Sequence, residues 1–218
     1  MERVSVPCPE VSGDIDDFGT RHPQKYSGCN AIELVRWWEG PDQLPQEKAV
    51  AYVGGSAAGL CFYVWLEDHI IYTEAREDNE RIWTLGDTAE FFIKPGIDRD
   101  DYWEIHISPN GFIMDIHIPS RAKFTEGIII WEEVIAADSA STKRVQVGDG
   151  EKQWAVELCV PWAAFGLEGA PAAGTVWQFA VCRYNYPGKL EDPEHSSTAH
   201  FTEPGYHRYE EYTDLVFA

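Results

Sequence analysis

The chain has 218 residues, with 17 Lys and Arg against 37 Asp and Glu, and therefore a formal net charge of −20. This excess of negative charge disfavours nucleic acid and anionic membranes as partners, because both are bound through clustered basic side chains. The 44% share of hydrophobic residues, with 10 Phe, 10 Tyr and 9 Trp, excludes a disordered chain. A neutral ligand, a cation or a basic partner fits this balance.

Ten short segments in which apolar and polar residues alternate predict β-strands. Turn dipeptides such as Pro95-Gly96, Asn110-Gly111 and Pro187-Gly188 separate them. Helical periodicity is limited to a turn or two at Ala31–Trp38 and Trp162–Phe165. The chain therefore predicts an all-β fold, a two-sheet antiparallel β-sandwich of jelly-roll or immunoglobulin-like type, as a single domain over 1–218. The predicted strands are Lys48–Gly54, Gly59–Glu67, Thr88–Lys94, Asp101–Ser108, Gly111–Ile118, Gly127–Ala136, Lys143–Val147, Gln153–Val160, Val176–Tyr186 and Tyr212–Phe217.

The strand Thr88–Lys94 is expected to turn Glu90 and Phe92 to one face and Phe91 to the other. Trp83 precedes this strand in a loop rich in charged residues. A Trp in such a loop either packs against the end of a core or serves as a platform for a ligand, and the sequence leaves both alternatives open.

The segment YWEIHISPNGFIMDIHI predicts a hairpin, because Asn110-Gly111 is a strong signal for a two-residue turn. With these two residues as the loop, Glu104 opposes His117 and His106 opposes Asp115. Strand alternation then places all four on one face, and Ile105, Ile107, Met114 and Ile116 on the face toward the core. The polar face is either a solvated surface with cross-strand charge pairs, the floor of a ligand site or a transition-metal site.

The cysteine pattern excludes the usual zinc ribbons, because the five cysteines contain no Cys-x-x-Cys pair. Cys61, Cys159 and Cys182 lie in apolar strand-like runs and are predicted to be buried thiols. No apolar run reaches the about 18 residues of a membrane span, and Met1–Glu10 lacks the pattern of a secretion signal. We expect a cytoplasmic protein, or a secreted or periplasmic one if a signal has been removed.

Longer motifs follow one another through most of the chain: VSGDIDDFGT, GLCFYVWLED, IWTLGDTAEFFIKP, YWEIHISPNGFIMD, WAVELCVPWAAFGL, VWQFAVCRYNYPG and YHRYEEYTDLVF. In this order they resemble the family 9 carbohydrate-binding modules and their relatives in the DOMON-like β-sandwich group. The chain departs from the family pattern at Tyr212-Thr213, where relatives usually have Phe-Gly, and at His106, where they have Arg.

The resemblance implies a non-catalytic carbohydrate-binding module that holds a sugar between two aromatic rings, with charged and amide groups beneath. It places the rings at Trp83 and Tyr206. It also assigns ligand contacts to Glu90, the carboxylate of the family signature, and to His106, at the position of the family's Arg. Arg183 and Asn185, of the Arg-x-Asn strand, are the remaining implied contacts. A role in polysaccharide catabolism, beside a glycoside hydrolase or another domain, and a structural calcium ion at Asp14 and Asp16 are further implications.

Three other functions compete with this interpretation. A glycoside hydrolase needs two carboxylates, which Glu90, Glu104 and Asp115 supply. Haem binding needs a Met or His ligand, and Met114 is predicted to face the core. A structural or protein-interaction sandwich is the third, with Trp37-Trp38 and the Tyr-rich end of the chain (Tyr206, Tyr209 and Tyr212) as its interface.

Overall fold

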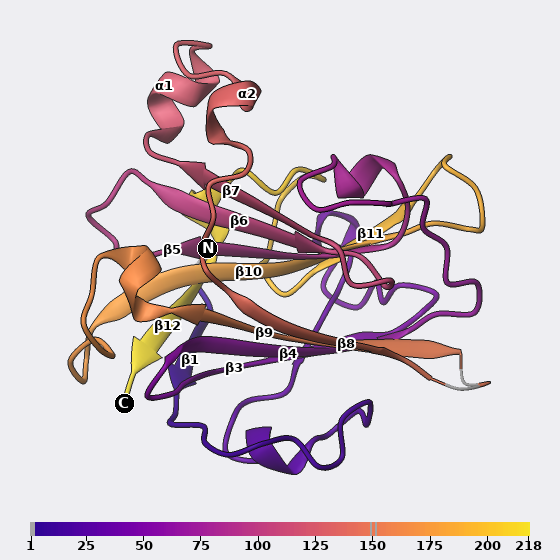
Figure 1. Ribbon diagram of the computed structural model, residues 1–218, viewed down its shortest axis with the longest axis horizontal. Coiled ribbons are helices and arrows are strands. Elements are labelled where there is room, and N and C mark those ends of the chain that lie inside the picture. The colour runs from indigo at the N-terminus through magenta and orange to yellow at the C-terminus, as the bar shows by residue number, and fades with distance from the viewer. Residues whose placement is uncertain (1–2, 149, 151) are drawn as a thin grey trace.

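Two β-sheets stack face to face in the computed structural model, which describes residues 3–148, 150 and 152–218 (Figure 1). The seven-stranded sheet has the order β1-β12-β10-β5-β6-β7, with β11 also paired to β10. Its strands are β1 (Ser5–Cys8), β5 (Thr88–Lys94), β6 (Tyr102–Ile107), β7 (Ile113–Ile118), β10 (Val176–Asn185), β11 (Glu194–Ser197) and β12 (Thr213–Phe217). The predicted all-β, two-sheet sandwich is confirmed, although β1 and β12 pair in parallel.

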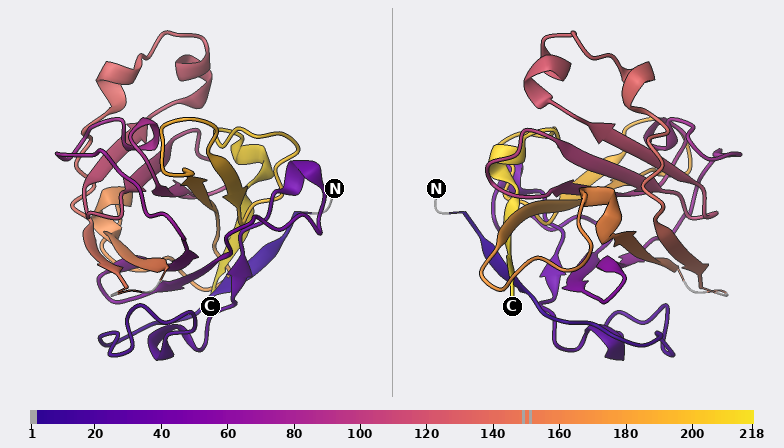
Figure 2. Two further views of the ribbon diagram at one scale, coloured as in Figure 1. Left: turned by 90° about the vertical axis from the view of Figure 1, so that its right-hand side faces the viewer. Right: turned by 60° about the vertical axis from the view of Figure 1, so that its left-hand side comes forward.

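The second sheet has five strands in the order β2-β3-β4-β9-β8. They are β2 (Ile32–Glu33), β3 (Ala49–Gly55), β4 (Gly59–Glu67), β8 (Thr142–Val147) and β9 (Gln153–Pro161). The end-on views in Figure 2 show the two layers and the loops that close them. Within the described residues, no helix has the length and apolar character needed to cross a membrane.

Three apolar clusters follow from this layering. The largest lies between the sheets and includes Phe62, Phe91 and Phe179. The second covers the outer face of the seven-stranded sheet, and the third lies where the N-terminal segment crosses the outer face of the five-stranded sheet. Both sheets are therefore covered on their outer faces, and polar side chains on those faces can be held in apolar surroundings.

The helices are short. They are α1 (Arg121–Thr125) and α2 (Trp131–Val134), with 3-10 turns η1 (Gln24–Tyr26), η2 (Trp37–Glu39), η3 (Ile82–Thr84), η4 (Trp162–Phe165) and η5 (Tyr209–Glu211). Figure 1 shows α1 and α2 projecting beyond β7 at the edge of the sheet. The predicted helical turn at Trp162–Phe165 is confirmed as η4, whereas Ala31–Trp38 contains β2 and only the beginning of η2.

The predicted strand Gly127–Ala136 is wrong, because Trp131–Val134 forms α2. The Glu133 carboxylate accepts a hydrogen bond from the backbone N–H of Ile130 at 3.1 Å, as an acidic residue does in the first turn of a helix. Local capping thus outweighs the strand preference of the β-branched residues. The sequence patterns also missed β1, β2, β11 and α1, all of five residues or fewer.

The hairpin between β6 and β7 is present, but its register differs from the prediction by one residue. Ile107 pairs with Ile113, and Glu104 pairs with Ile116. Pro109, with its fixed φ, lies at the second position of a turn closed by the Gly111 N–H and Ser108 oxygen at 2.9 Å, and Gly111 follows with φ +88°. The loop is therefore Pro109-Asn110-Gly111, a three-residue turn ending in a left-handed residue.

This shift changes which side chains share a face, because side chains alternate along a strand. Met114 and Ile116 lie in the outer cluster with Tyr102, and not with Ile105 and Ile107 in the cluster between the sheets. Asp115 and His117 consequently lie on the opposite face from Glu104 and His106.

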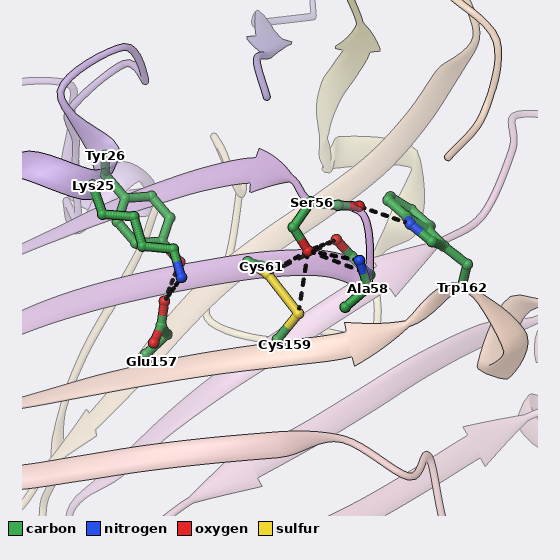
Figure 3. The surroundings of a disulfide bond; sticks show 9 residues. Lys25, Tyr26, Ser56, Ala58, Cys61, Glu157, Cys159 and Trp162 are labelled. Atoms are coloured by element: carbon green, nitrogen blue, oxygen red, sulfur yellow. Dashed lines mark hydrogen bonds and ion pairs between the residues drawn. A yellow bond between two sulfur atoms is a disulfide. The ribbon is translucent and has the colours of Figure 1, made fainter. Parts of the chain in front are cut away.

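The cysteine prediction is wrong for two of the three residues. Cys61 of β4 and Cys159 of β9 are directly opposed in the register and form a disulfide that links positions 98 residues apart in sequence. Figure 3 shows the Ser56 side chain beside this bond, with its Oγ 3.4 Å from Cys61 Sγ. Cys182 is a buried free thiol, as predicted. The pairing could not be read from the sequence because it depends on which strands are neighbours.

Candidate functional site

Three polar side chains lie side by side at the centre of the outer face of the seven-stranded sheet. Glu90 of β5 is paired with His106 of β6, and Glu104 is two residues before His106 on the same face. Their exposed fractions are 2%, 1% and 3%, so all three are buried beneath the outer apolar cluster. We call Glu90, Glu104 and His106 the carboxylate–imidazole cluster. The expected alternation of Thr88–Lys94, with Phe91 in the inner core, is confirmed.

The imidazole of His106 stands between the two carboxylates. Its Nε2 is 2.7 Å from Glu104 Oε1, and its Nδ1 is 3.3 Å from Glu90 Oε1. The second contact has an ion-pair distance without hydrogen-bond geometry. Among the described residues, His106 Nδ1 and Glu104 Oε2 are buried without a hydrogen-bond partner. Glu104 Oε2 also lies 3.5 Å from Nδ1 of His207, at ion-pair distance. Buried polar atoms without a hydrogen bond are candidates for an external partner such as water or a ligand hydroxyl.

Burial raises the pKa of Glu90 to about 8, because His106 only partly offsets the loss of solvent and Glu104 adds repulsion. Burial acts in the same direction on Glu104, but His207 and the hydrogen bond from His106 outweigh it and lower its pKa. For His106, burial favours the neutral ring, yet the two carboxylates prevail and raise its pKa. Environment therefore separates the proton affinities of the two carboxyl groups.

These shifts predict that stability falls as the pH rises. The folded protein keeps a proton on Glu90 between its ordinary pKa of 4.5 and about 8, whereas the unfolded chain loses it. The free energy of unfolding should therefore decrease through that window by up to about 1.4 kcal/mol per pH unit for each such group. The raised pKa of His106 acts in the same direction above 6.5, and Asp87, also raised to about 8, adds to the slope.

Chemical denaturation of the wild type and of Glu90→Gln between about pH 5 and pH 8 measures this contribution. The variant should show a flatter pH dependence, since its amide has no proton to lose. Glu126→Gln, at an exposed position after α1, is the control and should keep the wild-type slope. Equal slopes in the Glu90 variant and the wild type would contradict the assigned shift.

An aromatic rim borders the cluster. Trp83 of η3 is partly exposed, and its ring centroid lies 5.2 Å from that of His106 and 5.7 Å from that of Trp131 in α2. Trp131 in turn contacts Phe124, at 4.9 Å between centroids, and His207, at 5.7 Å. We call Trp83, Phe124, Trp131 and His207 the aromatic rim.

The sequence identified Trp83 but missed the rest of the rim as candidate site residues. Trp131 was assigned to a strand, and no motif marked Phe124. The single available signal was the position of His207 next to Tyr206. The Tyr102 hydroxyl lies 2.8 Å from Nδ1 of His207, which anchors the imidazole near Glu104.

Tyr206 does not form the second wall that the resemblance implied. Its ring is 5% exposed and packs among Phe92, Tyr184 and Phe201 at centroid distances of 5.6–6.0 Å. Its hydroxyl donates to the backbone oxygen of Arg183 at 3.2 Å. No ring contact joins Tyr206 to Trp83 within the described part of the chain. Tyr212 is buried as well, so these two residues form no exposed interface.

Arg183 and Asn185 lie on the other face of β10, away from the carboxylate–imidazole cluster. Arg183 is buried in an ion network in which its Nη2 lies 3.2 Å from Asp68 Oδ2. The same nitrogen donates to Asn185 Oδ1 at 2.8 Å, and Asn185 Nδ2 donates to Glu47 Oε2 at 2.8 Å. The two residues predicted to contact the ligand thus connect the ends of the two sheets.

Asp115 and His117 likewise make contacts that tie the chain together. The Asp115 carboxylate accepts hydrogen bonds from Ser139, from its N–H at 2.7 Å and its hydroxyl at 2.6 Å. His117 stacks on Trp103 with a centroid distance of 4.6 Å. The predicted cluster of four is therefore divided, and only Glu104 and His106 lie beside Glu90.

The opening turn that carries the predicted calcium ligands is acidic and exposed. Within the described residues, Asp14 and Asp16 have no hydrogen-bond or ion-pair partner, whereas the Asp17 carboxylate accepts from the backbone N–H of Gln24 at 3.0 Å. Oxygen donors of this kind suit Ca²⁺. Nevertheless, no group of three or more His, Cys, Asp or Glu side chains in the described ranges is arranged to hold a metal.

The fold is similar to those of three solved structures, which cover nearly the whole chain. A protein from Bacteroides uniformis, provisionally assigned to carbohydrate binding, aligns over 100% of both chains with a TM-score of 0.72 and 15% identity. A family 9 carbohydrate-binding module from Caldicellulosiruptor kristjanssonii aligns in its cellotriose complex (TM-score 0.66, 12% identity, 99% of this chain and 93% of that one). A family 9 module from the same organism in complex with glucose aligns with a TM-score of 0.67 and 11% identity, over 98% of this chain and 95% of that one.

No protein-family model matches the sequence, and no curated protein matches it significantly. The similarity is therefore one of architecture, over nearly the whole length of each chain. The chain has the fold of the family 9 carbohydrate-binding modules.

Proposed function

We propose that the protein binds carbohydrate without catalysing a reaction, with a sugar ring held at the aromatic rim above the carboxylate–imidazole cluster. The observation that carries this proposal is a pair of buried atoms without a hydrogen bond, His106 Nδ1 and Glu104 Oε2, next to the partly exposed ring of Trp83. Each lies at ion-pair distance from one neighbour, Glu90 at 3.3 Å and His207 at 3.5 Å, and has no hydrogen bond of its own. The family 9 modules solved with glucose and cellotriose support the ligand class, because they share the fold.

The chemistry of a pyranose suits this arrangement. Its C–H face can lie on an indole, which removes apolar surface from water at roughly 25 cal/mol per Å². Its hydroxyl groups can donate to a carboxylate and accept from an imidazole N–H. Trp83 and Trp131 come from separate elements, and a sugar enters between them by widening their present separation of 5.7 Å. Such an open site is expected to bind in the micromolar to millimolar range.

A glycan array followed by calorimetric titration tests the proposal. Retention of at least one class of neutral glycan, lost in Glu104→Gln with the fold intact, is the expected result. Binding of no glycan, or binding that is indifferent to both Glu104 and Trp83, would reject it.

A glycoside hydrolase is the second candidate, because the pKa of Glu90 is raised and that of Glu104 is lowered, as in an acid and base pair. The position of His106 opposes this function. Its ring occupies the space between the two carboxyl groups, where the scissile bond would have to lie. Prolonged incubation with the recognised glycan should release no reducing ends, and their release in the wild type but not in Glu90→Gln would establish hydrolysis.

We further propose a structural Ca²⁺ ion at the opening turn, held by Asp14, Asp16 and backbone oxygens. Chelation should then lower the melting temperature, and added Ca²⁺ at about 100 times its dissociation constant should restore about 2.7 kcal/mol of stability. Asp16→Asn should remove this response, with Asp192→Asn, at an exposed position elsewhere, as the control. Identical melting curves with and without chelator would exclude the ion.

The catabolic role expected from the resemblance, binding of a polysaccharide beside a glycoside hydrolase, stays a prediction. Co-purification of a hydrolase from cells grown on the recognised glycan would test it.

A further inference from the structure

A cavity lies on the side of the molecule opposite the aromatic rim, against the outer face of the five-stranded sheet. Its volume is about 530 Å³, which is within the range of small-ligand sites. Strands β4, β8 and β9 form its floor, and the N-terminal segment that runs beneath this sheet in Figure 1 supplies one wall. The residues that matter for its chemistry are Phe18, Thr20, Arg21, Trp65, Gln146 and Gln153.

Trp65 presents an indole to this cavity because of strand alternation. Its neighbours Val64 and Leu66 point into the core between the sheets, so Trp65 points outward. Its partners across the sheet are the small residues Val50 and Ala155, which leave the ring partly exposed. The other eight tryptophans contribute no side chain to this cavity.

The indole is fixed in position. Its Nε1 donates to Gln153 Oε1 at 2.8 Å, and Gln153 Nε2 donates to the backbone oxygen of Gly19 at 3.0 Å. The guanidinium of Arg21 lies over the ring, 5.4 Å from its centroid, and both Arg21 and Trp65 line the cavity. A ring that is already held loses little conformational freedom when a ligand stacks on it.

The polar groups around the ring suit hydroxyl groups and carry no net local charge. Arg21 is the only charged residue that lines the described part of the cavity, and it forms an ion pair with Glu33. Gln146 lines the cavity and donates from Nε2 to the Phe18 oxygen at 3.4 Å, so its Oε1 remains an acceptor. The Thr20 hydroxyl donates to Asp17 Oδ2 at 3.4 Å, and its oxygen is a further acceptor.

We propose that this cavity is a second saccharide site, which takes a neutral sugar unit with its C–H face on Trp65 and its hydroxyl groups on Thr20, Arg21 and Gln146. The site shares no residue with the aromatic rim and lies on the opposite sheet. It therefore adds to the proposed function and does not rest on it. Two sites on opposite faces would let one molecule hold two glycan chains, or two segments of one chain, with a gain in avidity.

The test follows the indole N–H signals of the intact protein by NMR during titration with neutral trisaccharides (cellotriose, xylotriose, mannotriose and maltotriose) up to about 10 mM. At least one of them should move the Trp65 signal. The Trp162 signal should stay in place, because that indole is buried and bonded to the Ser56 oxygen. A Trp65 signal that no trisaccharide moves would overturn the proposal.

Variants separate the two sites. Trp65→Ala, or Gln146→Ala where the first change disturbs folding, should weaken binding at this cavity at least about tenfold, or 1.4 kcal/mol. Val147→Ala, an exposed neighbour outside the cavity, should not. Binding that survives Trp83→Ala but not Trp65→Ala supports this inference even if the proposed rim site fails. Unchanged affinity in both Trp65→Ala and Gln146→Ala overturns it.

Discussion

Replacing Trp83 by alanine is expected to weaken glycan binding at the rim by about 10- to 100-fold, which corresponds to about 1.4–2.8 kcal/mol. The side chain is partly exposed and its ring borders His106 and Trp131, so its loss removes the stacking surface beside the carboxylate–imidazole cluster. The fold should persist, because the backbone of η3 is held independently, by the Tyr186 hydroxyl that donates to the Trp83 oxygen at 2.6 Å.

Calorimetric titration with the glycan found on the array, together with thermal unfolding, measures both effects. Trp37→Ala is the matched control: this indole is also partly exposed, but it stacks on His200, outside the rim. The control should lose some stability and keep its affinity. Equal affinity of the Trp83 variant and the wild type would remove the rim as the binding surface. Collapse of the fold would show instead that Trp83 is a core residue, the alternative that the sequence left open.

The elements that the sequence predicted well are those whose pattern has one physical interpretation. Thr88–Lys94 and Gly59–Glu67 are strands with the predicted bounds, because short, largely apolar runs bounded by turns are typical of strands buried on both faces. The helix Trp131–Val134 was missed because the β-branched residues around it favour strands. The capping contact to Glu133 that reverses this preference involves one side chain and leaves no periodic pattern in the sequence.

The candidate site was predicted less well, for two reasons. One is register: Pro109 moves the turn by one residue, and that shift sends Asp115 to the opposite face from His106. The other is depth. A motif fixes the position of Tyr206 along the chain but not whether its ring faces solvent, and packing against Phe92 and Phe201 decides that it does not. Spacing was sufficient only for Glu104 and His106, which lie two residues apart on one strand. Glu90 was assigned through the resemblance, and the pairing of β5 with β6 places it opposite His106.

Replacing Arg183 by methionine is expected to lower the stability by about 3–5 kcal/mol, the usual cost of removing one partner from a buried ion pair. Arg183 is 1% exposed and is the cation nearest the buried Asp68 carboxylate, at 3.2 Å. Burial already raises the pKa of Asp68 against the attraction of Arg183, so this carboxylate would remain without compensation. The melting temperature should fall by about 10 °C.

Adding Asp68→Asn to Arg183→Met should recover part of the loss, because the amide removes the uncompensated charge and keeps a side-chain oxygen for the Trp154 N–H, now at 3.0 Å. Lys189→Met, which breaks an exposed ion pair with Glu191, is the control and should change stability by less than about 1 kcal/mol. Glycan affinity, measured where the Arg183 variant is folded, should stay close to that of the wild type. Lost affinity with unchanged stability would show instead that Arg183 contacts the ligand. A residue that only joins the two sheets should change binding only through a change in the stability of the fold.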